Sequence, residues 1–242
     1  LNNITDTNKV IAYAQTIRDL FIGEQLNGNN PKLIIKITNA SGKDASSVNS
    51  LFNILNGVSL SNLDFEIVYS NVNFETEKLY SNWGLFANSL QNVTINNCNF
   101  SITIENDLTI KNSDTFGSIY NVKNAGLLFG EIINSSIVNS KFIVSAKGIE
   151  ISNDKIENFG ILAGYVENSS LANNRYDFTV AEVKNSVSSE NINIAGLVGV
   201  LNYSTLSGGN NPNYIKINNG STIEISNNYN VKQMNVSSLV AY

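Results

Sequence analysis

The chain has 242 residues and a formal net charge of −5, and only 14% of its residues are charged. It contains two arginines and no histidine. This composition disfavours a phosphate-binding surface, and it excludes Ser–His and Cys–His catalytic groups and histidine-ligated metals within this chain. We therefore expect no nucleic-acid partner and no cofactor. No apolar run of about 18 residues is present, so no transmembrane segment is expected.

The N-terminal region contains the stretch with helical periodicity. Between Asn3 and Gly23, the apolar residues fall on one face of a helix, with Asp6 or Thr7 available as the N-cap. An amphipathic helix at this position can cover the open first coil of a solenoid, whose strand edge would otherwise be exposed. We therefore predict a helical cap over residues 1–31. A linker helix from another domain is the alternative.

From residue 32 onward the sequence consists of repeats, which are clearest between Gly126 and Val144. The first core position of the repeat recurs at intervals of 35, 42, 34, 35 and 42 residues. Its members are Leu51, Phe86, Leu128, Leu162, Leu197 and Leu239. Repeats in a fixed register place like residues above one another, as in a coil of β-strands spaced about 4.8 Å apart.

The segments within each repeat are short, β-branched or aromatic, and separated by polar corners, which is typical of strands. Lys32–Asn39 predicts the first strand, which gives about six coils over residues 32–242. The expected fold class is therefore all-β, a parallel β-helix solenoid with an N-terminal amphipathic capping helix. A helical repeat of about 34 residues is disfavoured, because asparagine and β-branched residues are poor in helix interiors.

Two columns of the repeat are predicted to form structural ladders. In one, aromatic rings stack on one another inside the coil, and in the other, asparagine side chains hydrogen-bond to those above and below at a corner. The aromatic column contains Phe65, Phe100, Phe142 and Tyr176. The asparagine column contains Asn62, Asn97, Asn139 and Asn173.

Three segments with paired glycines each precede a short strand, namely Gly126–Gly130, Gly160–Gly164 and Gly196–Gly199. They resemble the GLUG motif (Gly-Leu-hydrophobic-Gly) of repeat arrays in secreted and surface proteins. Only Gly196–Gly199 has the four-residue form, and the other two segments hold one extra residue. The resemblance covers residues 51–242. It implies a right-handed parallel β-helix of the pectin-lyase-like superfold.

A polysaccharide lyase or hydrolase on this fold needs carboxylates that stacking brings together. In the expected register, the columns that hold Asp64, Glu131 and Glu167 each contain one acid. The chain is therefore predicted to have no catalytic residue and not to be an enzyme, although acids in the loops can still cluster. Cys98, the single cysteine, is expected to be a small buried filler.

Two groups of surface residues are candidate sites for glycans. Nine N-x-S/T sequons occur among 43 asparagines, about as many as chance gives. Three of them share one register column at an outward-facing corner: Asn92, Asn134 and Asn168. We expect these to carry glycan if the source is a secreting eukaryote; asparagine serving only as a corner residue is the alternative. The candidate residues for sugar stacking are Tyr69, Tyr80 and Trp83.

The sequence thus predicts a non-enzymatic structural or adhesive segment of a secreted or cell-surface protein, such as a stalk, filament or adhesin. A carbohydrate-binding or polysaccharide-cleaving β-helix is the alternative. The expected partners are other surface or matrix proteins or glycans. Because Ser237–Tyr242 begins another repeat, the chain is expected either to continue beyond Tyr242 or to stack end to end as a homo-oligomer or filament.

Overall fold

The computed structural model of the chain describes residues 32–38, 50–70, 74–76, 82–112, 122–152, 155–185, 191–207, 214–217, 222–225, 233–237 and 239–240. These residues form an all-β solenoid in which every strand pair is parallel. No helix occurs within these ranges. The helical cap predicted over residues 1–31 lies outside the described residues.

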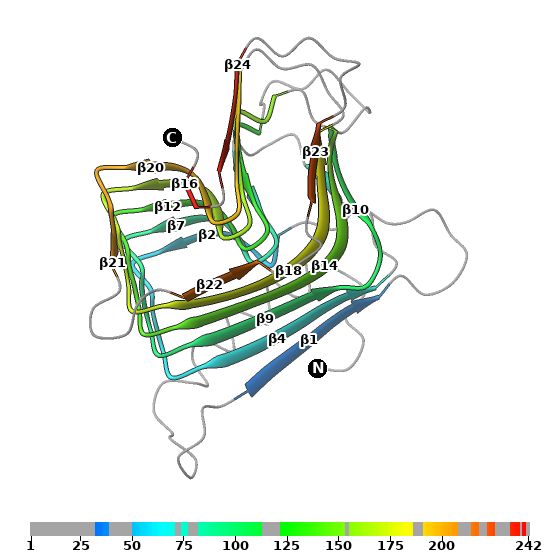
Figure 1. Cartoon of the computed structure of the whole chain (residues 1–242). Coiled ribbons are helices and arrows are strands. Elements are labelled where there is room, and N and C mark those ends of the chain that lie inside the picture. The colour runs from blue at the N-terminus through cyan, green and yellow to red at the C-terminus, as the bar shows by residue number, and fades with distance from the viewer. Residues whose placement is uncertain are drawn as a thin grey trace.

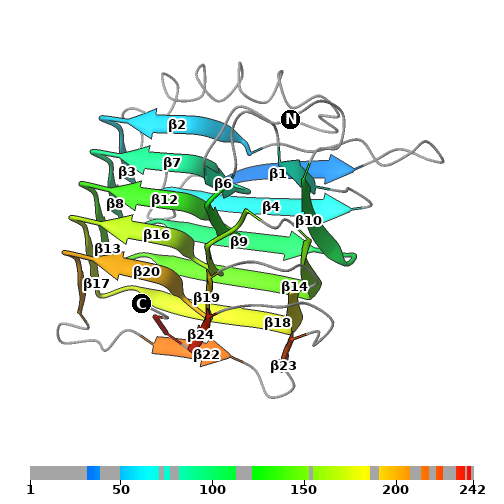
Figure 2. The same ribbon diagram turned by 90° about the horizontal axis from the view of Figure 1, so that it is seen from above.

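Each turn of the solenoid passes through four sheets in the same order, which we call sheets I to IV (Figure 1). Figure 2 shows the strands of sheet I stacked in chain order. Sheet I contains β2 (Phe52–Asn56), β7 (Ala87–Gln91), β12 (Phe129–Ile133), β16 (Ala163–Glu167) and β20 (Val198–Asn202). Sheet II contains β3 (Ser59–Ser61), β8 (Thr94–Asn96), β13 (Ser136–Val138), β17 (Ser170–Ala172) and β21 (Thr205–Ser207).

Sheet III is the largest of the four, with nine strands. It contains β1 (Lys32–Thr38), β4 (Asp64–Ser70), β5 (Phe74–Thr76), β9 (Asn99–Ile104), β10 (Leu108–Asn112), β14 (Lys141–Ser152), β18 (Arg175–Asn185), β22 (Tyr214–Ile217) and β23 (Thr222–Ile225). Sheet IV contains β6 (Asn82–Gly84), β11 (Asn124–Gly126), β15 (Asn158–Gly160), β19 (Asn191–Ala195) and β24 (Gln233–Ser237).

The described residues build about four turns, so the prediction of six coils is not supported. The complete turns are β2–β6, β7–β11, β12–β15 and β16–β19. The prediction also counted β1 and the last pass, β20–β24, as whole coils, and the stretches that join β21, β22, β23 and β24 lie outside the described residues. The strand β1 pairs only with β4 in sheet III, and Leu239 and Val240 contribute one isolated bridge, from Val240 to Val198.

The aromatic column lies in the register that the sequence predicts. Phe65 pairs with Phe100, Phe100 with Phe142, and Phe142 with Tyr176 on consecutive strands of sheet III. The ring centroids are 4.9, 5.1 and 5.6 Å apart, and the interplanar angles are 14°, 9° and 14°. All four side chains are buried. The column is therefore a stack of near-parallel rings that ties four turns together through apolar burial.

The paired glycines lie where sheet IV meets sheet I. A Cβ atom on Gly130 would lie 2.5 Å from the carbonyl oxygen of Asn88, and one on Gly164 would lie 2.5 Å from the nitrogen of Ala125. At Gly130 and Gly164, therefore, two backbones approach too closely to admit a side chain. In an earlier turn Asn88 occupies this position, and its Oδ1 accepts a 3.3 Å hydrogen bond from the nitrogen of Gly84.

Candidate functional site

The corner between sheets I and II is built by one left-handed residue in each turn. These residues share a register column, because the backbone N–H of each one in the first four turns donates to the carbonyl group that precedes the corner residue of the next turn. The column consists of Gly57 (φ 66°), Asn92 (54°), Asn134 (49°), Asn168 (47°) and Tyr203 (44°). Glycine and asparagine tolerate this conformation far better than other residues, which explains why they recur at the corner.

A serine ladder on the inner side of this corner holds neighbouring turns in place. The Ser135 Oγ accepts a 3.0 Å hydrogen bond from the Val93 nitrogen and donates one of 2.7 Å to the Ile133 carbonyl. In the next turns, the Ser169 Oγ accepts a 3.0 Å hydrogen bond from the Ser135 nitrogen, and the Ser204 Oγ accepts one of 2.9 Å from the Ser169 nitrogen. The backbone N–H groups that the corner would otherwise leave unsatisfied are thus bonded to hydroxyls, which keeps the corner rigid.

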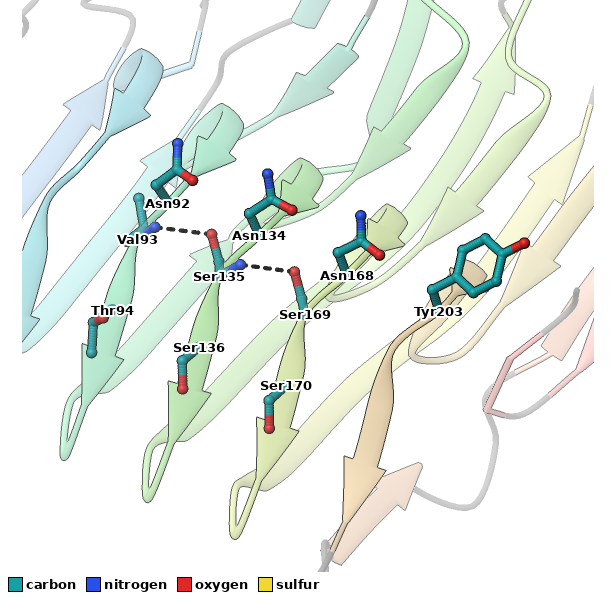
Figure 3. Close-up of a pocket in the computed structure, with 10 residues that line it drawn as sticks. All are labelled: Asn92, Val93, Thr94, Asn134, Ser135, Ser136, Asn168, Ser169, Ser170 and Tyr203. Carbon is teal, nitrogen blue, oxygen red and sulfur yellow. Dashed lines mark hydrogen bonds between the residues drawn. The ribbon is translucent and has the colours of Figure 1, made fainter.

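A shallow open groove with a volume of about 590 Å³ runs along the outside of this corner. Figure 3 shows the corner asparagines in one row, with Tyr203 continuing the row in the last turn. A second row is formed by the hydroxyl residues Thr94, Ser136 and Ser170. The full lining is Asn92, Val93, Thr94, Asn134, Ser135, Ser136, Asn168, Ser169, Ser170 and Tyr203. The groove therefore crosses several turns and lies parallel to the axis along which they stack.

The lining of the groove is neutral, and it presents amides and hydroxyls rather than carboxylates or ammonium groups. Asn92, Asn134 and Asn168 are exposed to solvent. Tyr203 is 86% exposed, the highest value among the large hydrophobic side chains on the described surface. Such a surface can donate and accept hydrogen bonds to an uncharged polar ligand and can stack one ring against it.

The three predicted glycan acceptors all lie in this groove. Asn92, Asn134 and Asn168 occupy one exposed corner column, as the register predicts. The hydroxyl residue of each sequon lines the same groove. Attachment of glycan to these asparagines stays a prediction.

The predicted asparagine column lies at the second corner, between sheets II and III. Asn62, Asn97, Asn139 and Asn173 are all left-handed, with φ values of 57°, 53°, 53° and 57°. The Asn97 Nδ2 donates to the Asn62 Oδ1 at 2.7 Å, as a ladder requires. The Asn139 Nδ2 instead donates to the Asn96 Oδ1 at 3.2 Å. At this corner, asparagine is needed mainly for the backbone conformation, and side-chain stacking is only partial.

A longer asparagine ladder, which the sequence analysis did not predict, lies in sheet IV of the described structure. Each asparagine Nδ2 donates to the Oδ1 of the previous turn, at 2.8, 2.7, 2.7 and 2.7 Å. The members are Asn82, Asn124, Asn158, Asn193 and Asn235. A signal for it was present, because these residues recur at the same intervals of 42, 34, 35 and 42 as the core columns.

The predicted aromatic cluster for sugar stacking is wrong for two of its three members. The Tyr69 side chain is fully buried, and its hydroxyl donates to the Leu85 carbonyl at 3.2 Å. Trp83 is also buried, in a column of sheet IV with Ala125 and Phe159. Tyr80 lies outside the described residues. The structure places an exposed aromatic ring at Tyr203 instead, which the sequence reasoning missed.

The carboxylates of sheet I have neutral neighbours in their columns, as the register predicts. Glu131 lies between Ser89 and Tyr165, and its Oε1 accepts a 2.7 Å hydrogen bond from the Ser89 Oγ. In sheet III, Glu66 forms an ion pair with Lys32. Within the described ranges, no group of three His, Cys, Asp or Glu residues is placed to hold a metal ion.

Cys98 is buried at the second corner, as expected for a small filler. Its Sγ is 3.5 Å from the Asn96 carbonyl oxygen, and its nitrogen donates to the Ser140 Oγ at 3.1 Å. Burial raises the pKa of the Cys98 thiol to about 11. The thiol is therefore protonated at neutral pH and acts as a packing group.

Comparisons of the chain with protein-family models, with curated proteins and with solved structures give no match. The parallel β-solenoid and its asparagine stacking are therefore established by the geometry of the chain itself. In the part of the chain that the structure describes, no helix has the length and apolar character needed to cross a membrane.

Proposed function

We propose that this chain is a non-enzymatic structural or adhesive segment of a secreted or cell-surface protein, such as a stalk, filament or adhesin. The observation that carries the proposal is the continuity of its ladders. The aromatic column and the sheet IV amide ladder run from turn to turn along the stacking axis. Such ladders make a stiff rod whose surface is free to present repeated side chains to a partner.

The glycine geometry supports a place among GLUG-motif surface proteins with a right-handed parallel β-helix. The motif needs two small residues separated by a hydrophobic pair or triplet. In this chain, Gly126 and Gly130 occupy positions where a Cβ would lie 2.0 and 2.5 Å from backbone atoms. The spacing therefore has a steric cause in the crossing from sheet IV to sheet I.

The paired charges of sheet III also fit a structural role. Glu150 and Lys184 carry opposite charges at paired positions of neighbouring strands, and Lys32 forms an ion pair with Glu66. Opposite charges on neighbouring strands stabilise strand pairing rather than creating a catalytic pair. Surface or matrix proteins, glycans, or further copies stacked end to end are the partners we propose.

Surface labelling tests the location. Antibodies raised against the purified chain should label intact cells of the source organism, and brief protease treatment of those cells should remove the label. Labelling that requires permeabilised cells would contradict a secreted or surface role.

A reducing-sugar assay tests the alternative of a polysaccharide-cleaving β-helix. The purified chain is incubated with a panel of neutral and acidic polysaccharides, with a boiled sample as the control. We expect no release of reducing ends above the control. Steady release that is proportional to protein concentration would overturn the non-enzymatic assignment.

A further inference from the structure

The groove along the first corner has the features of a binding site for an elongated ligand. Its two rows repeat once per turn, at the strand spacing of about 4.8 Å. One row offers the amides of Asn92, Asn134 and Asn168, and the other offers the hydroxyls of Thr94, Ser136 and Ser170. A ligand that matches this surface presents polar groups at a similar interval along an extended chain.

Tyr203 differs from the other corner residues in a way that packing does not require. The left-handed backbone conformation at this position favours Gly or Asn, as in Gly57 and Asn92, and it is strained for an aromatic residue. The ring is nonetheless 86% exposed and contributes to the groove. Its neighbour Asn202 is anchored, because its Nδ2 donates to the Tyr165 hydroxyl at 3.2 Å and to the Glu167 Oε1 at 3.3 Å.

We propose that this groove binds an extended, uncharged, β-linked glycan that runs across successive turns and stacks one sugar ring on Tyr203. The ten lining residues carry no charge, so the ligand needs no ionic group. Sugar hydroxyls both donate and accept hydrogen bonds, which matches amide and hydroxyl side chains. The apolar face of a pyranose fits an exposed phenol ring, and an extended β-linked hexose chain advances by close to one strand spacing per sugar.

The chain as a whole argues against an acidic glycan as the occupant. The net charge is −5, and the lining offers no arginine or lysine to pair with a sulfate or carboxylate. An acidic glycan would therefore meet repulsion without a compensating ion pair. This inference rests on the adhesive role proposed above and names the class of ligand for it.

The test is a titration of the protein, produced in bacteria so that it carries no glycan, with cellohexaose and chitohexaose. Binding is followed by amide chemical shifts. We expect saturable shifts at residues 92–94, 134–136, 168–170 and 203 with at least one of the two sugars. A heparin hexasaccharide should leave these signals unchanged. The absence of shifts at millimolar sugar, or equal shifts with heparin, would overturn the proposal.

Matched variants separate binding from folding. Tyr203→Asn removes the ring while supplying a residue that favours the left-handed backbone, so the fold should persist and the affinity should fall about five- to tenfold. The double variant Asn134→Gly/Asn168→Gly should weaken binding by about tenfold. The control Asn139→Gly/Asn173→Gly changes the same backbone type at the second corner, and binding should stay within about twofold of the wild type.

The outcomes distinguish this inference from the function on which it rests. Wild-type affinity in Tyr203→Asn, or equal losses in the two double variants, would overturn the groove assignment. Surface labelling of intact cells would in that case still support the structural role. Loss of surface labelling together with specific groove binding would instead support a glycan-binding protein and overturn the surface role.

Discussion

The amide ladder of sheet IV and the first corner column both use asparagine at the same interval, but for different physical reasons. In the ladder, from Asn82 to Asn235, side chains bond to one another at 2.7–2.8 Å. In the corner column, from Gly57 to Tyr203, the backbone is left-handed and the asparagine side chains are exposed. The asparagines of these two columns therefore reflect two requirements, one for the amide group and one for the backbone.

The two columns also differ in which substitutions they already contain. The ladder holds asparagine at all five described positions. The corner column also contains Gly57, which adopts the left-handed backbone without strain, and Tyr203, which adopts it with strain. The ladder depends on the amide side chain, so other residues cannot replace asparagine there. The corner column depends on the left-handed backbone, so any residue that can adopt this conformation is tolerated there.

The largest loss in the free energy of unfolding is expected for a substitution in the apolar core, outside both asparagine columns. Phe142→Ala removes a fully buried ring that stacks on Phe100 and Tyr176, at 5.1 and 5.6 Å. We expect a loss of about 3–5 kcal/mol in the free energy of unfolding. Denaturant unfolding followed by circular dichroism measures it. Unchanged stability would mean that Phe142 does not lie in the aromatic column.

The middle of the amide ladder should show the next largest effect. Asn158→Ala removes two hydrogen bonds of 2.7 Å and leaves the amides of Asn124 and Asn193 each short of a partner. With about 1 kcal/mol for each bond, we expect a loss of about 2 kcal/mol. The same unfolding assay applies, and a loss below about 0.5 kcal/mol would argue that the ladder does not stabilise the fold.

The second corner should be less sensitive. Asn139→Ala places alanine in a left-handed backbone (φ 53°) and removes the 3.2 Å bond to Asn96. We expect a loss of about 1–2 kcal/mol, chiefly from backbone strain. Asn139→Gly serves as the control, because it removes the same bond without the strain. If the two variants are equally unstable, the loss comes from the side-chain bond instead.

The smallest effect is the onset of alkaline unfolding. Burial raises the pKa values of the Tyr69 and Tyr176 phenols well above their ordinary value, so the folded protein holds these protons more tightly than the unfolded chain. The contribution of the two protonated phenols to the free energy of unfolding is fully present below their unfolded-state pKa of about 10. It is lost as the pH rises above that value. At pH 10 the combined loss should be below about 1 kcal/mol, and it should grow at higher pH.

Thermal unfolding between pH 8 and 11 measures this onset, with Tyr69→Phe/Tyr176→Phe as the control. The melting temperature of the wild type should fall more steeply above pH 10 than that of the double variant. Parallel curves for the two proteins would show that other groups govern the alkaline transition.

Much of the fold could be predicted from the sequence because stacked turns repeat their core residues in register. The aromatic column and both corner columns follow from aligning the repeats, as Phe65 with Phe100 and Asn92 with Asn134 show. Sheet IV was missed because its core column mixes Trp83, Ala125 and Phe159, whereas the equally short strands of sheet II repeat Ile or Leu. A column of unlike residues does not stand out when the repeats are aligned, although Asn82 and Asn124 kept the interval of the repeat.

The exposure of single aromatic residues was harder to predict. Trp83 occurs in a polar stretch and looks like a surface residue, but its column partners Ala125 and Phe159 show that the position faces the core. Tyr203 lies between polar residues and falls in the corner register, where glycine or asparagine is expected. Only alignment of the last repeat to the left-handed column would have indicated that its ring points outward.

The most direct test of the two-role account compares alanine with glycine at one position in each column. At Asn134 (φ 49°), glycine should be more stable than alanine by about 1 kcal/mol, because it reaches the left-handed backbone without strain. At Asn158, in strand β15, glycine should be less stable than alanine by about 0.5–1 kcal/mol, because it loses more backbone entropy. We therefore expect the difference in unfolding free energy between the glycine and alanine variants to have opposite signs at the two sites. The same sign at both would contradict the distinction between an amide role and a backbone role.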